Sequence, residues 1–188
     1  MNRRNPDSSG TSLRSILIAR EICVPYGQIK KNRSMRNDDV IKSIRYILDL
    51  PDATIAEILK SAGYQPKRSE IEFIFDESWP DGEKPDTTHE LTAHVLAGLI
   101  YHRRGKSDKH PPRPITVPIT NNVVLKKLRV AFKLREEDII RIIKKAGFTM
   151  TSSEVNALFR KPKSRNFKKC GDQVLRYFLK GLAMTHRS

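Results

Sequence analysis

The feature that most constrains this fold is an internal duplication. Residues 37–64 align without gaps on residues 121–148, and ten of the 28 aligned pairs are identical. Random pairing at ordinary composition would give roughly two identities. The similarity continues at Glu70 and Glu154, and it returns with an offset of 83 at Gly98 and Gly181. A repeat with this long a period indicates one structural unit that is present twice.

Each unit is predicted to form about four short helices. Apolar residues at positions 40, 41, 44, 47 and 48 share one face of a first helix, and those at 55, 58, 59 and 62 repeat the pattern for a second. Gly63 followed by Tyr64 predicts the end of that second helix. The spacing of Ser69 and Glu72 predicts a capping box for a third helix, which runs through Phe75.

A fourth helix is expected over residues 88–101, and its copy over residues 172–184. Gly98 and Gly181 lie inside these helices, where glycine costs about 1 kcal/mol relative to alanine. Their recurrence predicts that another helix packs closely against them. Asn37 and Asn121 are predicted to cap the first helix of each unit.

No segment alternates apolar and polar residues as a strand does, so the fold class is all-α. We expect two tandem homologous units of about four short helices each, related by a pseudo-twofold axis. Residues 1–34 are expected to form a poorly ordered basic tail, residues 35–101 the first helical repeat, residues 102–118 a proline-rich linker, and residues 119–188 a basic second repeat.

Composition excludes several classes of protein. No apolar run approaches the roughly 20 residues of a membrane span or forms an uninterrupted secretory leader. The two cysteines, Cys23 and Cys170, are too few and too far apart for a disulfide framework or a four-cysteine zinc site. These features predict a cytoplasmic protein with no membrane partner.

The net charge of +15 is unevenly distributed along the chain. Residues 35–118 carry a net charge of −2, whereas residues 119–188 carry +12. The contrast is sharpest in the segment before the fourth helix, which is acidic over residues 76–86 and has six cations over residues 160–169. Because the two units share a fold, packing of the core cannot require both versions.

The basic segment permits three interpretations. It is suited to contact a nucleic-acid backbone, RNA more than sequence-read DNA, because cations neutralise phosphates, an aromatic ring can stack on a base, and a helix N-terminus follows. It could also be a solvated loop, or it could dock on an acidic protein surface such as that of a second copy. The candidate nucleic-acid-binding residues are Arg160, Lys161, Lys163, Arg165, Phe167, Lys168, Lys169 and Arg176.

Other constellations do not support chemistry. His89 and His94 align with Asp172 and Tyr177, so the fold does not need imidazole there and no metal site is predicted. Cys170 follows two lysines, which lowers a thiol pKa, but a role at a helix start is favoured over a reactive thiol. Neither a Gly-rich phosphate loop nor a Ser/His/Asp arrangement is evident, so we predict no catalytic residue and no cofactor.

Arg45 and Arg129 are matched at the margin of the first helix. The favoured interpretation is an arginine that packs its stem and exposes its head. The alternative is a shared ligand contact.

Several motifs together resemble a known family. They are Leu-Ile-Tyr-His-Arg-Arg-Gly-Lys at 99–106, Thr-Asn-Asn at 120–122, Leu-Phe-Arg-Lys-Pro at 158–162 and Cys-Gly-Asp-Gln at 170–173. The combination is similar to the YehS family of bacterial proteins, built on domain of unknown function 1456, over about residues 35–187. The resemblance implies a small cytoplasmic protein with a tandem domain, and it supplies no catalytic residue.

These observations together predict a non-enzymatic cytoplasmic protein whose basic second repeat binds nucleic acid, either RNA or a ribonucleoprotein. The alternative is a protein-interaction adaptor or a self-associating module, with a protein partner or a second copy as its ligand.

Overall fold

The computed structural model of the chain describes residues 34–80, 82–106 and 114–187. The predicted basic tail, apart from Ser34, and residues 107–113 of the predicted linker lie outside these residues. Every regular element in the described part of the chain is a helix. The first repeat contains α2 (Asn37–Leu48), α3 (Asp52–Ser61), α4 (Arg68–Phe75) and α5 (His89–Arg104). The second contains α6 (Asn121–Ala131), α7 (Glu136–Lys145), α8 (Ser152–Phe159) and α9 (Asp172–His186).

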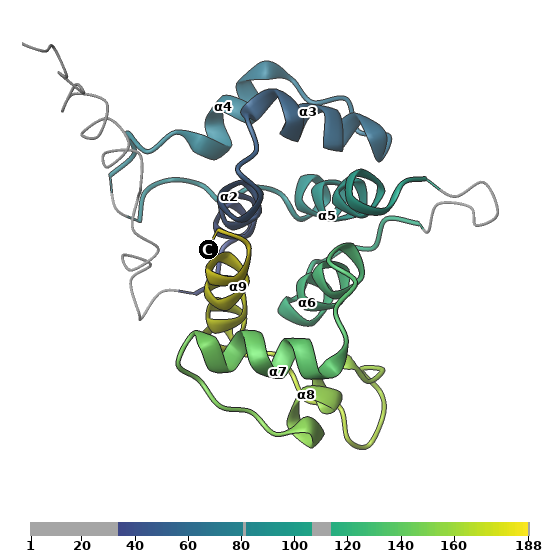
Figure 1. The fold of residues 1–188 in the computed structure, drawn as a ribbon. Helices are drawn as coiled ribbons and strands as arrows, with labels where there is room; N and C mark the ends of the chain where they lie inside the picture. The colour runs from purple at the N-terminus through teal and green to yellow at the C-terminus, as the bar shows by residue number, and fades with distance from the viewer. Residues whose placement is uncertain (1–33, 81, 107–113, 188) are drawn as a thin grey trace, which may run out of the picture. The chain divides into compact units, whose positions relative to one another are not determined.

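The first and fourth helices of both repeats, which are α2, α5, α6 and α9, lie together in the middle of the helical structure formed by the two repeats (Figure 1). Helix α5 packs against α6, and α2 packs against α9. Exchanging the two repeats turns each of these contacts into the other, as a pseudo-twofold axis requires. Helices α3 and α4 lie on one side of the four central helices, and α7 and α8 lie on the opposite side (Figure 1). The predicted all-α fold of two homologous units is confirmed.

The closest packing within each repeat is between its second and fourth helices. Helix α3 lies against α5, and α7 lies against α9. A Cβ atom built on Gly98 would lie 2.0 Å from the carbonyl oxygen of Ile58, and one built on Gly181 would lie 1.9 Å from that of Ile142. The predicted close approach of a second helix at both glycines is therefore confirmed.

The second helix of each repeat ends as the sequence predicts. Gly63 and Gly147 adopt φ angles of 85° and 97°, in the left-handed region that favours glycine. The next residue turns back on the helix, because the N–H of Tyr64 donates to the carbonyl of Leu59 at 3.1 Å and the N–H of Phe148 donates to that of Ile143 at 3.2 Å. These bonds satisfy carbonyl groups that the helix itself leaves unpaired.

Two predictions about helix starts are wrong. Helix α4 begins earlier than the Ser69–Glu72 spacing suggests, and Glu70 is the residue that accepts the N–H of Lys67, at 2.7 Å. The caps of α2 and α6 are Arg36 and Thr120, one residue before the predicted asparagines.

The two asparagines instead tie the first helix of each repeat to the start of its fourth. The side-chain amide of Asn37 donates to the carbonyl of Thr87 at 2.8 Å, and that of Asn121 donates to the carbonyl of Cys170 at 3.1 Å. Each asparagine, which the sequence predicts to be a helix cap, therefore forms a tertiary contact between two helices of its repeat instead.

Two arginines near the ends of α5 and α9 contact the opposite repeat. The guanidinium of Arg187 lies 4.3 Å from the ring centre of Tyr46 and donates to the carbonyl oxygen of the same residue at 2.5 Å. The guanidinium of Arg103 lies 5.0 Å from the ring centre of Phe132. Helix α5 also extends to Arg104, into the segment expected to be linker. No described helix has the length and apolarity needed to cross a membrane.

Candidate nucleic-acid interface

Most of the predicted binding residues lie in one loop, residues 160–169, which we call the basic loop. It joins α8 to α9, and all six of its cations are exposed, while Phe167 is half-buried. The ammonium of Lys168 lies 3.6 Å from a carboxylate oxygen of Glu154. Within the described part of the chain, the side chains of the other five cations form no ion pair: Arg160, Lys161, Lys163, Arg165 and Lys169.

Asn122, a buried residue of α6, bridges the two ends of the basic loop. Its amide group donates to the carbonyl of Leu158 at 2.8 Å and to that of Lys168 at 3.0 Å. Its side-chain oxygen accepts the N–H of Cys170 at 2.9 Å. Within the loop, the N–H of Phe167 donates to the carbonyl of Ser164 at 3.0 Å. A neutral side chain thus fixes the base of the loop, so the loop's own cations are not needed to hold its backbone.

The corresponding loop of the first repeat, residues 76–86, is held differently; we call it the acidic loop. The ammonium of Lys84 turns inward and donates to the carbonyls of Ile74 and Asp76, at 3.0 and 2.7 Å. The guanidinium of Arg36 donates to the carbonyls of Lys84 and Pro85, both at 2.7 Å. Burial, followed by repulsion from Lys42, lowers the pKa of Lys84. Cations therefore perform in the acidic loop the structural work that Asn122 performs in the basic loop.

Lys126 on α6 belongs to the same surface and is not among the predicted residues. Its ammonium donates to the carbonyl of Arg160 at 3.2 Å. Its counterpart in the first repeat, Lys42, instead pairs with Glu77 of the acidic loop at 3.6 Å. The identity of residues 42 and 126 was the only signal in the sequence, and it did not show that α6 lies under the loop.

Arg176 does not belong to this surface. It lies on α9 and is only 7% exposed, so it cannot reach a polymer in solution as the other candidates can. The structure places its side chain on the buried side of α9, which a count of charges does not reveal. We therefore remove it from the set.

The N-terminus of α9 contributes less than expected to anion binding. Asp172 occupies the first turn, and its carboxylate accepts the side-chain amide of Asn121 at 2.6 Å. A phosphate at this helix end would face that negative charge. Contacts with an anion must therefore come from the side chains of the basic loop.

The Cys170 thiol is not positioned for reaction. The side chain is 1% exposed, and burial, followed by the charge of Asp172, raises its pKa to about 12. The flanking lysines Lys168 and Lys169 point to solvent and do not offset this effect. The role at a helix start is the one that fits, since the backbone of Cys170 bonds to Asn122 and Asn121.

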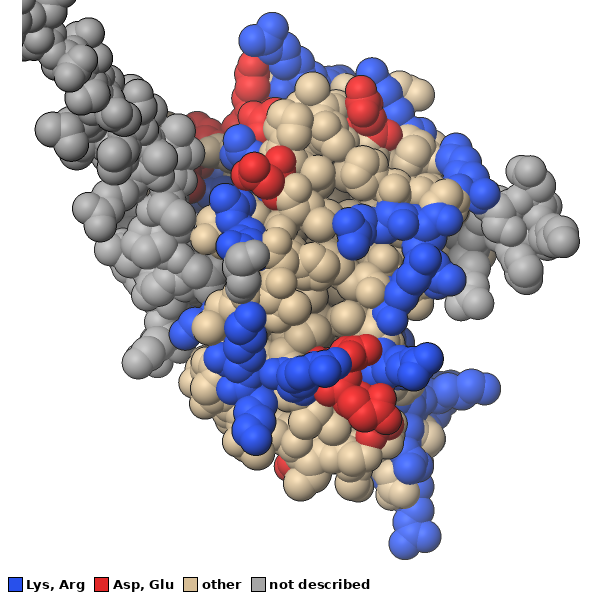
Figure 2. All heavy atoms as spheres, viewed as in Figure 1, with Lys and Arg blue, Asp and Glu red and all other residues tan. Residues whose placement is uncertain are grey.

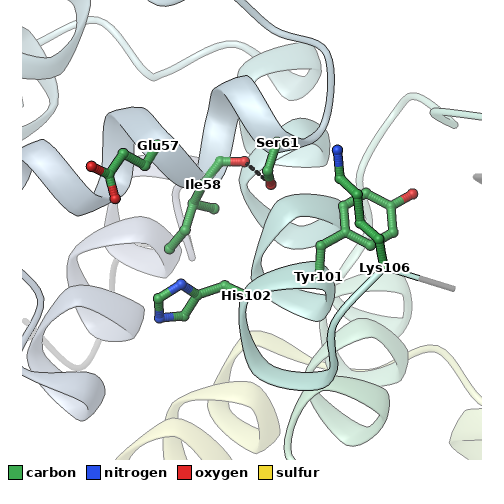
Figure 3. Close-up of a pocket in the computed structure, with 6 residues that line it drawn as sticks. All are labelled: Glu57, Ile58, Ser61, Tyr101, His102 and Lys106. Atoms are coloured by element: carbon green, nitrogen blue, oxygen red, sulfur yellow. Dashed lines mark hydrogen bonds between the residues drawn. The ribbon is translucent and has the colours of Figure 1, made fainter.

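One shallow hollow elsewhere collects several polar side chains. It has a volume of about 220 Å³ and lies between α3 and α5 (Figure 3). Tyr101 and Lys106 lie together on one side of it, whereas Glu57 and His102 lie on the other, so the polar groups do not converge on one point (Figure 3). The hydroxyl of Ser61 is already used, because it donates to the carbonyl of Ile58 at 2.7 Å. We see no catalytic arrangement there.

The histidines of α5 have ordinary contacts. A ring nitrogen of His94 lies 2.8 Å from the carbonyl of Glu90, and the ring lies 5.1 Å from that of Tyr64. Among the described residues, no three His, Cys, Asp or Glu side chains come together as metal ligands would.

Figure 2 draws one face of the charge distribution. Lys and Arg side chains are spread over both halves of that face, and Asp and Glu side chains gather at a few places. Six of the cations behind the net charge of +12 of the second repeat lie in the basic loop.

Comparisons with known proteins agree with the duplication. The family model described as "Protein of unknown function (DUF1456)" matches residues 37–105 and, a second time, residues 121–188. The chain is 37% identical over 151 residues to a protein of Escherichia coli (strain K12) named "Uncharacterized protein YehS", an alignment that covers 79% of this chain and 95% of that protein. No solved structure matches the chain.

Proposed function

Because the chain belongs to the DUF1456 family of proteins of unknown function, and the family description names no activity, we propose a function from the surface of the second repeat: the basic loop binds the backbone of nucleic acid, preferentially single-stranded RNA. The protein acts as a non-enzymatic binding module, alone or within a ribonucleoprotein. Its two distant cysteines suit a reducing compartment, so we place this activity in the cytoplasm.

The observation that carries the proposal is the exposure of five cations that form no ion pair with any described residue, on a loop whose base is fixed by Asn122. A cation that forms no ion pair within the protein does not have to break one when it meets a phosphate. Each contact releases a counterion condensed on the polymer, which favours binding at low salt. The acidic loop supplies the internal comparison, since its own Lys84 and the nearby Arg36 at the start of α2 both donate to carbonyl groups of that loop.

Phe167 favours a single strand over a duplex. Its ring is half-buried beside the exposed cations and can offer a face to an unpaired base. Base stacking on an aromatic side chain contributes about 1–3 kcal/mol. We expect Phe167→Ala to weaken binding of single-stranded RNA by that amount and to leave duplex binding unchanged.

A salt titration tests the proposal directly. On a single strand, each neutralised phosphate contributes about −0.7 to the slope of log affinity against log salt, so four or five contacts give roughly −3 to −3.5. Replacing Lys161, Lys163 and Lys169 by glutamine should flatten the slope by about 2. Circular dichroism would check that the helical content is unchanged.

A matched control separates the effect of the basic loop on binding from the effect of the protein's net charge. Replacing three exposed lysines outside the second repeat by glutamine, at positions 60, 67 and 106, removes the same charge. This control should keep the full slope. Equal effects of the two triple variants would reduce the interaction to nonspecific attraction. Failure to bind single-stranded RNA, duplex RNA and DNA at low salt would reject the proposal, and a charge-dependent protein complex would then favour the adaptor.

A further inference from the structure

A second hollow lies in the first repeat, between α4 and the N-terminus of α5, and its volume is about 350 Å³. It combines an apolar wall with hydroxyl and carboxylate groups. Its lining residues are Ser69, Glu70, Phe73, Ile74, Asp86, Thr87, Thr88 and Leu91. This hollow is separate from the basic loop, and the inference drawn from it does not depend on the proposed function.

The hydroxyl of Thr87 is the first sign of a ligand here. Thr87 is 6% exposed and lines the hollow, yet among the described residues its Oγ1 atom has no hydrogen-bond partner. A buried hydroxyl without a partner is costly, because it has lost its bonds to water and gained none in return. The second repeat avoids this cost, since Cys170, a weak hydrogen-bonding group, occupies the equivalent position.

The second sign is the carboxylate of Glu70. It accepts the hydroxyl of Tyr64 and the N–H of Lys67, both at 2.7 Å. The bond from the N–H of Lys67 and, second, the bond from Tyr64 hold the pKa of Glu70 below its usual range. The carboxyl group is therefore ionised. Both donors are uncharged, and the negative charge therefore remains at the edge of the hollow. The other carboxylate, Asp86, accepts the N–H of Asn37 at 3.0 Å.

The second repeat shows what fits beside this carboxylate. Glu154 is the counterpart of Glu70, and the ammonium of Lys168 lies 3.6 Å from it. The first repeat has Pro85 at the position of Lys168, and its neighbour Lys84 is committed to the carbonyls of Ile74 and Asp76. In the described part of the chain, an ammonium group forms an ion pair with this carboxylate in the second repeat, whereas in the first repeat the charge of Lys67 acts on Glu70 without forming an ion pair.

We propose that the hollow between α4 and α5 binds a primary alkylammonium group. The carboxylate of Glu70 balances the charge of the ammonium, and Oγ1 of Thr87 accepts one of its hydrogens. The side chains of Phe73, Ile74 and Leu91 pack along the alkyl chain. The group can belong to a free aliphatic diamine or to a lysine side chain of a protein, and both present the same chemistry.

Nuclear magnetic resonance on the full chain tests this proposal with three probes. They are 1,5-diaminopentane, lysine blocked at both its amino and carboxyl termini, and pentanol as a neutral analogue. We expect saturable shifts of the amide signals of Glu70, Thr87 and Thr88 with the two amines at millimolar concentration, and none with pentanol. Tighter binding of the diamine would identify a free amine as the ligand, and tighter binding of blocked lysine would identify a protein side chain.

Two variants and one control locate the contacts. Glu70→Gln keeps an acceptor for the N–H of Lys67 but removes the charge, and it should weaken binding of the amines about tenfold or more. Thr87→Val keeps the shape of the buried side chain and should weaken binding severalfold. Glu154→Gln, the matched change in the second repeat, should leave the affinity unchanged. Equal loss with Glu154→Gln, equal shifts with pentanol, or no saturable shift at Thr87 would overturn the proposal.

Discussion

At the scale of single residues, Gly98 and Gly181 are the positions at which a larger side chain would overlap a neighbouring helix. Each allows a carbonyl of the neighbouring helix to approach where a Cβ atom would otherwise lie, at 2.0 Å from Ile58 O and 1.9 Å from Ile142 O. Both partners are backbone atoms, which cannot move aside as the end of a side chain can. The favourable helix propensity of alanine is therefore outweighed by overlap with the neighbouring helix.

We expect Gly98→Ala and Gly181→Ala each to lower the free energy of unfolding by on the order of 1–3 kcal/mol. Denaturant unfolding followed by circular dichroism would measure the change. Gly171→Ala is the control, because no atom of the described residues lies within 4 Å of a Cβ atom built there. Its cost should stay below about 1 kcal/mol. Unchanged stability in both helix variants would contradict the close approach.

The arginines Arg45 and Arg129 show how a matched pair of charged residues can be structural. Their guanidinium groups lie 4.4 and 4.7 Å from the ring centres of Phe75 and Phe159. Their Nε atoms also donate to the carbonyls of Leu50 and Leu134, at 3.4 and 3.2 Å. Each arginine joins the first helix of its repeat to the third helix and to the following turn. This arrangement favours the packing interpretation over a ligand contact.

Cys170 gives a prediction about reactivity. With a pKa raised to about 12, its thiolate fraction at pH 8 is negligible and grows only as the pH approaches that value. In a Cys23→Ser variant, we expect the folded protein to react with a disulfide reagent about 1000-fold more slowly than an unfolded thiol, or slower. Absorbance of the released thiol measures the rate, and guanidinium-unfolded protein is the reference. Rapid stoichiometric labelling of the folded chain at pH 8 would show that the thiol is accessible.

At the scale of elements, the two loops before α5 and α9 occupy the same place in their repeats and are held by different chemistry. Asn122 bonds both ends of the basic loop, whereas Arg36 and Lys84 bond the acidic loop. Because Asn122 is neutral, it holds the basic loop without burying a seventh positive charge beside the six that the loop carries. In the acidic loop, the positive charges of Lys84 and Arg36 offset the negative charges of the loop's carboxylates. The composition of each loop and the means of holding it are thus linked.

Asn122→Ala should unfold the base of the basic loop. It leaves the carbonyls of Leu158 and Lys168 and the N–H of Cys170 without their partner. We expect a loss of about 2–3 kcal/mol in the free energy of unfolding, measured by denaturant titration. Asn156→Ala, an exposed change on α8, is the control and should be neutral or slightly stabilising. A neutral effect of Asn122→Ala would mean that the loop is held in another way.

At the scale of the whole molecule, the repeats depend on each other for part of their core. Helix α5 lies against α6 and α2 against α9, so each repeat covers an apolar face of the other. Arg187 adds a polar contact between them, since its guanidinium bonds to Tyr46 and lies 3.3 Å from a carboxylate oxygen of Asp49.

We therefore expect residues 34–188 to unfold in one cooperative transition, with equal calorimetric and van't Hoff enthalpies. Arg187→Ala should destabilise both repeats together, by about 1–2 kcal/mol. The control is Arg104→Ala, which changes the aligned residue of the first repeat at an exposed position. Two resolved transitions in the calorimeter, with only one moved by Arg187→Ala, would show that the repeats unfold independently.

By itself, the sequence determined the number of repeats, the helical class, the glycine-terminated second helices and the close contacts at Gly98 and Gly181. These features follow from local periodicity and from comparing one repeat with the other, and both are written along the chain. It also identified the loop in which exposed cations gather. These features can be predicted because they depend on residues close together in the sequence, or on positions where the two repeats differ.

Only the tertiary structure decided which polar side chains are free and which are used. The bridge formed by Asn122 and the place of Lys126 under the basic loop join groups 30 or more residues apart in the chain. The burial of Arg176 and of the Thr87 hydroxyl, which has no partner among the described residues, depends on which side of a helix or loop faces the core. Spacing along the chain carries no information about such pairs. Their energies depend on burial and on hydrogen-bond geometry, and both arise only when the helices have packed.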